Sequence, residues 1–262
     1  MEQPTERSYQ ELLHYLLLSF LIAWGVWVPI YFEMLPNTLI PLGFVGPIAA
    51  ATFLTYRNSG KQGLRTLYSG LIRSKVRPIW YLALFTPALL TLMTHGIFAL
   101  FFKYDALANP GVIAINFLII SIFLILEEVG WRGYALPRLQ KSRNALEASL
   151  ILGGVWALWH FPFWTISPIA GAPEPFYIFY ITGSLGAIAM AIILTWIYNN
   201  TRQSILMTTL CHASFNATIG AMTFATSDAL YHNLIFVTLS LGTSVILVGV
   251  FGKRHLKASS SL

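Results

Sequence analysis

Residues 111–129 read GVIAINFLIISIFLILEEV, an apolar run that is long enough to cross a bilayer and ends close to two adjacent carboxylates. Similar near-continuous apolar runs occur along the rest of the chain, at about 10–32, 37–56, 79–102, 147–166, 176–198, 204–226 and 232–251. Each run has the length of a membrane-spanning helix. We therefore predict an all-α, polytopic membrane helical bundle of about eight transmembrane helices, forming a single integral membrane domain over residues 1–262.

Composition supports this class and excludes others. The chain has 262 residues, of which 56% are hydrophobic and 10% are charged, whereas an ordinary soluble domain has roughly 25% charged residues. No large soluble domain fits between the apolar runs. The single cysteine, Cys211, excludes an intramolecular disulfide and any C-x-x-C redox or zinc motif. The N-terminal segment lacks a basic region before its long apolar run, so we expect it to be retained as the first span.

The distribution of charge predicts the orientation in the membrane. If the N-terminus is inside, every Lys and Arg except Lys103 falls on the inner side, whereas Glu33, Asp105, Glu174 and Asp228 fall in outer loops. The positive-inside rule therefore predicts an N-in, C-in topology in the cell (plasma) membrane. The net charge of +6 is thus explained by topology and by contact with anionic lipid. The lipid bilayer is the expected partner, and no nucleic-acid role is needed.

The polar segment 57–78 interrupts this pattern. Leu64, Leu67 and Leu71 recur at helical spacing, while Lys61 and Arg65 lie off that stripe. We expect a short interfacial helix that lies on the headgroups.

Ionisable residues inside apolar runs are costly in lipid, so each is a functional candidate. Glu127 and Glu128 lie about 25 Å along their run at 1.5 Å per residue, which places them in the inner third of the bilayer. Arg132 is at i+4 from Glu128, so these two can pair on one helix face. Glu127, about 100° away around the helix, is then free to point at another helix.

Two other runs carry further candidates. His212 and Asn216 are four residues apart and lie on one helix face, where they can together position a water, a metal or a carbonyl oxygen. A structural helix-helix hydrogen bond is the alternative for such a histidine. His160 precedes Pro162, which predicts a kink. Counted in residues from the inner end of its run, His160 lies deeper in the bilayer than the glutamates. His95 lacks a partner at helical spacing, and His232 is expected in an outer turn, so both are weaker candidates.

Three motifs now appear in order on separate spans. Glu127–Arg132 reads E-E-x-x-x-R and is followed by GYALPRLQ, Trp156–His160 reads aromatic-x-x-x-H, and His212–Asn216 reads H-x-x-x-N. In this combination the chain resembles the CAAX protease and bacteriocin-processing family of intramembrane endopeptidases, also called the CPBP or ABI family. The resemblance covers about residues 111–220, the expected catalytic core. One departure is Trp156, because the second motif of the family usually has Phe at that position.

The resemblance implies an endopeptidase that hydrolyses peptide bonds of a CAAX-type or related membrane-associated substrate, such as a prenylated peptide, on the cytoplasmic side. Glu127 would be the general base that activates water, with His160 holding that water. His212 and Asn216 would orient the scissile carbonyl and stabilise the oxyanion. Glu128 and Arg132 would support them.

The involvement of a metal is open at this point. Glu127, His160 and His212 would suit zinc or another divalent metal, as in a metalloprotease, and a metal-free glutamate mechanism uses the same atoms. The zincin motif H-E-x-x-H is absent. Two other functions also remain: a non-catalytic scaffold or immunity protein on the same fold, and a transporter built on broken helices.

Overall fold

The computed structural model describes residues 6–102, 110–166, 176–220 and 229–258. Within these ranges the chain is helical and contains no strand, which confirms the predicted all-α class. Lys103, Asp105, Glu174 and Asp228, used above to predict the orientation, lie outside the described residues.

The element order defines a bundle of long helices linked by short ones. The elements are α1 (Glu6–Tyr31), η1 (Asn37–Leu39), α2 (Ile40–Gly43), α3 (Gly46–Ser69), η2 (Gly70–Ile72), α4 (Ile79–Ala83), α5 (Thr86–Ala99), α6 (Pro110–Glu128), the π-helix η3 (Val129–Ala135), α7 (Leu136–Leu139), α8 (Ala145–Trp159), α9 (Phe161–Ile166), α10 (Phe176–Asn200), α11 (Ile205–Gly220) and α12 (Ala229–Phe251).

Several segments are long and apolar enough to cross a membrane. By length and composition, the described residues contain five such segments, namely Tyr9–Tyr31, Asn37–Ile72, Gly111–Leu139, Phe176–Asn200 and Leu230–Phe251. Thr86–Ala99 and Ala145–Trp159 are shorter apolar helices. A polytopic helical membrane protein is thus confirmed, while the number of eight crossings stays a prediction.

Some predicted spans are divided where prolines begin new helices. The run 79–102 is two helices, α4 and α5, and Pro87 lies in the first turn of α5. The run 147–166 is also divided, because α8 ends at Trp159 and α9 starts at Phe161, just before Pro162. Proline lacks an amide proton and is tolerated mainly in a first helical turn, which explains both breaks.

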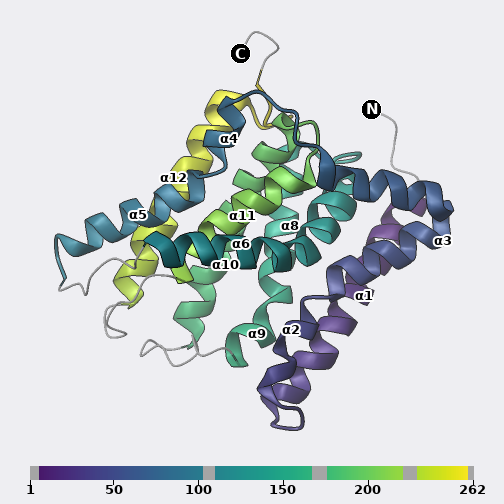
Figure 1. Cartoon of the computed structure of the whole chain (residues 1–262), viewed down its shortest axis with the longest axis horizontal. Coiled ribbons are helices and arrows are strands. Elements are labelled where there is room, and N and C mark those ends of the chain that lie inside the picture. The colour runs from purple at the N-terminus through teal and green to yellow at the C-terminus, as the bar shows by residue number, and fades with distance from the viewer. Residues whose placement is uncertain (1–5, 103–109, 167–175, 221–228, 259–262) are drawn as a thin grey trace.

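The long helices pack in neighbouring pairs. α6 packs along α11, α10 lies between α8 and α12, and α1 packs on α3, while α5 contacts both α11 and α12. In Figure 1, α6 runs across the view at a steep angle to α12. The same view shows that α1 begins and α12 ends at one end of the molecule, at the top. Chain ends on one side are expected for an even number of crossings, and the assignment of that side to the cytoplasm stays a prediction.

The polar segment after the second span is helical as far as Ser69. Helix α3 is assigned as one helix, but Gly60 has φ +57° and ψ −154°, and the helix axis is kinked at this residue. Beyond this break Leu67 is buried, whereas Lys61 and Arg65 are exposed. The amphipathic helix predicted for this segment is therefore present, and its contact with lipid headgroups stays a prediction.

Candidate functional site

The site lies where the end of α6 meets α11 and α8. Glu127 and Glu128 form the last turn of α6, and the packing of α6 along α11 brings His212 to the same level. Figure 1 shows these helices in the centre of the molecule. All three side chains are almost fully buried. Since a buried charge is unfavourable without partners, the contacts of each carboxylate decide what the site can do.

Glu128 forms a buried charged cluster with its neighbours. Its Oε1 accepts from Nη1 of Arg132 at 2.9 Å and lies 3.0 Å from Nδ1 of His212. The ion pair predicted for Glu128 and Arg132 on one helix face is confirmed. Because a carboxylate only accepts hydrogen bonds, Nδ1 of His212 is the donor and its Nε2 is left to face another group. Glu128 therefore fixes the orientation of the His212 ring.

Glu127 points away from that cluster, as the 100° offset predicts. Its Oε2 accepts a hydrogen bond from the indole Nε1 of Trp156 at 2.9 Å. Within the described part of the chain, Oε1 of Glu127 accepts no hydrogen bond. This oxygen is also not fully enclosed by protein atoms. One carboxylate oxygen is thus held by α8, and the other is available.

Trp156 is a site residue that the sequence did not reveal as one. Besides its bond to Glu127, its ring lies 5.1 Å from that of His212 and 5.3 Å from that of His160, both edge to face. The guanidinium of Arg132 lies over the same ring at 5.1 Å. The signal in the sequence was the indole itself, because a phenylalanine at this position of the motif has no hydrogen-bond donor.

His160 occupies the C-cap of α8. Its Nδ1 lies 2.9 Å from the carbonyl oxygen of Trp156, so Nδ1 is the donor and Nε2 is the free acceptor. Trp164 stacks on the imidazole at 5.4 Å, and Trp159 contacts its edge at 4.7 Å. The greater depth predicted for His160 does not separate it from the glutamates, because Trp156 contacts both Glu127 and His160.

Asn216 has fewer contacts with the site than the other candidates. It lies one turn after His212 on α11 and is half-buried. Within the described residues the structure gives its amide no hydrogen bond, so only its helical position relates it to the site. The structure thus joins Glu127, Glu128, Arg132, His160 and His212 through shared contacts and leaves Asn216 beside them.

The π-helix η3 follows the two glutamates directly and explains how Arg132 is held. A π-helix commonly marks a functional site, and here six of its seven residues are buried, including Arg132. The turn fits closely against α1 and α3, because a Cβ on Gly130 would lie 2.5 Å from Cβ of Pro47 and from the hydroxyl of Tyr15. Only glycine fits at this position without displacing its neighbours.

Three of the candidate side chains are of types that bind metals. The set expected from the sequence was Glu127, His160 and His212. Among the residues that the structure describes, no three His, Cys, Asp or Glu side chains are grouped so that they could hold one metal ion. In this arrangement the donors present therefore do not form a common metal site.

Comparison with known proteins adds an independent line of support. A family model described as type II CAAX prenyl endopeptidase Rce1-like matches residues 108–218. The chain is also 27% identical over 221 residues to CAAX prenyl protease 2 of Methanococcus maripaludis, an alignment that covers 77% of this chain and 81% of the relative. The resemblance to CAAX endopeptidases read from the three motifs is confirmed, and all six candidate site residues lie within the region that the family model matches.

Proposed function

We propose that this chain, which matches the Rce1-like CAAX prenyl endopeptidases over residues 108–218, hydrolyses a peptide bond of a CAAX-type, membrane-associated substrate with a water activated by Glu127. The observation that carries the proposal is the burial of this carboxylate together with its contacts. Glu127 is 3% exposed, one of its oxygens is held by Trp156, and no Lys or Arg of the described residues forms an ion pair with it. Such an arrangement leaves one oxygen to take a proton from water.

Each neighbouring residue has a role in this proposal. The free Nε2 of His160 accepts a hydrogen bond from the attacking water, so that the water is held by two acceptors. The ring of His212 is anchored by Glu128 through Nδ1, and when both ring nitrogens carry a proton its Nε2 donates to the scissile carbonyl oxygen. Asn216 supplies an amide N–H to the same oxygen. These donors stabilise the oxyanion as negative charge develops.

The proton balance of the reaction is complete without a further group. Glu127 removes one proton as the water oxygen bonds to the carbonyl carbon. When the C–N bond breaks, the protonated Glu127 delivers that proton to the leaving amine, and the carboxylate is restored. Glu128 and Arg132 act as positioning residues through His212. The reaction would take place on the cytoplasmic side of the plasma membrane, with a prenylated peptide as the substrate class to test first.

The experiment is cleavage of a quenched-fluorescent prenylated C-a-a-X peptide by the full chain in liposomes. We expect Glu127→Gln to lower kcat by roughly a thousandfold or more, because it removes the base but keeps the size of the side chain. Glu33→Gln, which changes an exposed carboxylate, is the matched control and should cleave normally. Full activity of Glu127→Gln would refute the mechanism. Absence of cleavage by folded wild type would refute the CAAX substrate class and would leave a protease with another substrate, the scaffold and the transporter as the alternatives.

A chelator decides the remaining question about zinc. The metal-free mechanism expects that dialysis against EDTA or 1,10-phenanthroline leaves kcat within about twofold of its starting value. Loss of activity that is restored by added Zn²⁺ would instead assign a metal to this site.

A further inference from the structure

The end of the bundle where α12 finishes carries a second feature, separate from the buried glutamates. A cavity of about 880 Å³ lies there between the turn before α8, the turn after α10 and the segment that follows α12. Six basic side chains line it, and we call them the basic ring: Lys141, Arg143, Arg202, Lys253, Arg254 and Lys257. Among the described residues that line it, only Glu147 is acidic. The cavity therefore concentrates positive charge.

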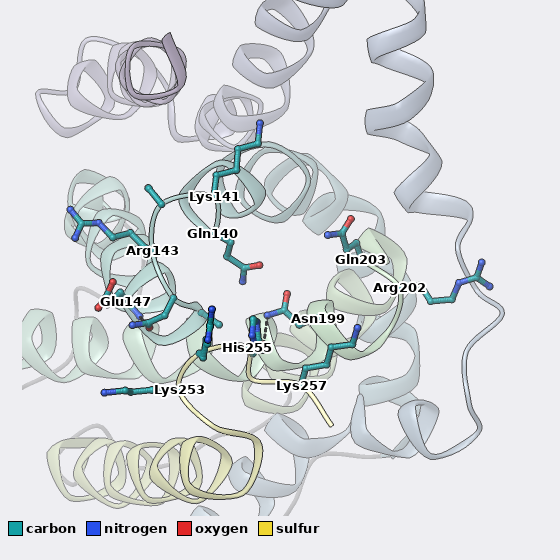
Figure 2. Close-up of a pocket in the computed structure, with 14 residues that line it drawn as sticks. Gln140, Lys141, Arg143, Glu147, Asn199, Arg202, Gln203, Lys253, His255 and Lys257 are labelled. Carbon is teal, nitrogen blue, oxygen red and sulfur yellow. Dashed lines mark hydrogen bonds between the residues drawn. The ribbon is translucent and has the colours of Figure 1, made fainter. Parts of the chain in front are cut away.

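This charge is not neutralised by the protein. Within the described residues, ion pairs involve Arg132, Arg138 and His212 and none of the basic ring. Gln140, which points into the opening in Figure 2, has an amide nitrogen that is enclosed and lacks a hydrogen-bond partner. Lys257 also points toward the opening in Figure 2. The cavity thus offers several hydrogen-bond donors against a single carboxylate, Glu147, among the described residues that line it.

The cavity is built by fixed backbone and not by a chance grouping of surface lysines. The amides of Ala145 and Leu146, at the start of α8, donate to the carbonyl oxygens of Arg254 and Lys253 at 3.0 and 3.1 Å. The side-chain amides of Asn199 and Asn200, at the end of α10, donate to the carbonyls that follow α12 at 2.8 Å each. These bonds join the segment after α12 to two other helices.

Two further features hold this wall in place. Leu256 is fully buried and anchors the segment in the core. On the opposite side Arg202 and Gln203 both have φ +59°, a left-handed conformation that is strained for these residues. Strain of this kind persists where the surrounding structure imposes it and is a marker of functional sites.

We propose that the basic ring binds the phosphate of an anionic glycerophospholipid, such as phosphatidylglycerol, from the leaflet at that end of the bundle. Basic pockets between membrane helices on the cytoplasmic side bind anionic headgroups, and the cavity volume is in the range of ~300–1,000 Å³ typical of small-molecule sites. The positive-inside rule predicts that this end faces the anionic inner leaflet. Free phosphate shares the chemistry, whereas only the lipid is held next to the site by the bilayer.

The test measures lipid binding and so does not depend on peptidase activity. The full chain is purified in a neutral detergent, and dioleoyl phosphatidylglycerol is titrated in while bound lipid is counted by native mass spectrometry. The triple variant Lys253→Ala, Arg254→Ala, Lys257→Ala should bind about a hundredfold more weakly, because each basic residue near a phosphate contributes about fivefold. Glu147→Gln should bind severalfold more tightly, since it removes the acidic group of the cavity.

Controls separate this site from general surface charge. Lys61→Ala, Arg65→Ala removes two exposed cations elsewhere on the same predicted face and should not change binding. Dioleoyl phosphatidylcholine should bind no better to wild type than to the triple variant. The altered side chains are exposed, so the triple variant should unfold at the wild-type temperature without lipid, and a Gln version of it serves if the Ala version unfolds early.

Three results would overturn the proposal. The first is equal binding of phosphatidylglycerol by wild type and by both folded triple variants. The second is an equal loss in the Lys61, Arg65 control, which would indicate non-specific attraction. The third is full competition by millimolar inorganic phosphate, which would assign the site to free phosphate instead of lipid.

Discussion

The buried pair of Arg132 and Glu128 allows a test that depends on whether a second substitution raises or lowers the stability of the protein. Both side chains are fully buried, and they meet at 2.9 Å. Arg132→Met removes the cation and leaves the Glu128 carboxylate in the core with His212 and the hydroxyl of Thr208 beside it. Breaking a buried pair by removing one member costs about 3–5 kcal/mol. For a chain of this size, that corresponds to a fall in Tm of roughly 6–20 °C.

The structure also predicts what a second substitution does. Nε and Nη2 of Arg132 and Oε2 of Glu128 are enclosed and have no hydrogen-bond partner within the described residues. The desolvation of these atoms therefore offsets part of the attraction between the charges. Adding Glu128→Gln to Arg132→Met removes the buried carboxylate that has lost its arginine partner, so the double variant should be more stable than Arg132→Met alone by at least about 1 kcal/mol.

The assay is thermal or denaturant unfolding in one detergent, with peptide cleavage measured in parallel. Arg138→Met is the matched control, because Arg138 meets Glu11 at 3.2 Å while both side chains remain about a fifth exposed. Because this pair is in contact with solvent, its loss should cost less than the loss of the buried pair, and fully exposed pairs contribute about 0–1 kcal/mol. A double variant less stable than Arg132→Met would refute the argument about the unpaired carboxylate. Both Arg132 variants should also lose activity, because Arg132→Met removes the group that positions Glu128, and the double variant also replaces the carboxylate to which His212 donates.

Two further predictions concern the close contacts of the site. Trp156→Phe keeps an aromatic ring beside His160 but removes the donor to Glu127, so kcat should fall about tenfold while the protein stays folded, as checked by cleavage kinetics and circular dichroism. Unchanged kcat would show that this bond does not position the base. Gly130→Ala should destabilise the protein by about 1–3 kcal/mol through overlap with Pro47 and Tyr15, measured by unfolding. Gly154→Ala, with nothing within 4 Å of the new methyl, is its control and should not destabilise.

The class of fold and much of the site follow from local sequence. Apolar runs of sufficient length indicate membrane helices wherever they occur, and the i+4 spacing of Glu128 and Arg132 is enough to predict their ion pair. The local pattern does not predict the path of the chain between these helices. The prolines explain the breaks near Pro87 and Pro162, whereas the π-helix after Glu128 depends on how neighbouring helices pack.

The pairing of His95 with His232 illustrates the same limit. The sequence gives His95 no partner at helical spacing and wrongly predicts an outer turn for His232, which is buried in α12. Helix α5 packs on α12 and places Nδ1 of His95 3.3 Å from Nε2 of His232. A contact between residues 137 positions apart is a property of the helix arrangement. Spacing rules within one helix do not detect it.

Trp156 shows that a residue can match a motif while one of its interactions is not predicted from that motif. In the motif it stands where an aromatic ring is expected, and a comparison of residue types regards its exchange with phenylalanine as conservative. The packing of the site turns the indole N–H toward Glu127, and this single donor makes the exchange non-conservative for the proposed base. If Trp156→Phe lowers kcat without unfolding the protein, the catalytic unit of this chain includes a hydrogen bond from the aromatic position of the second motif to the first glutamate.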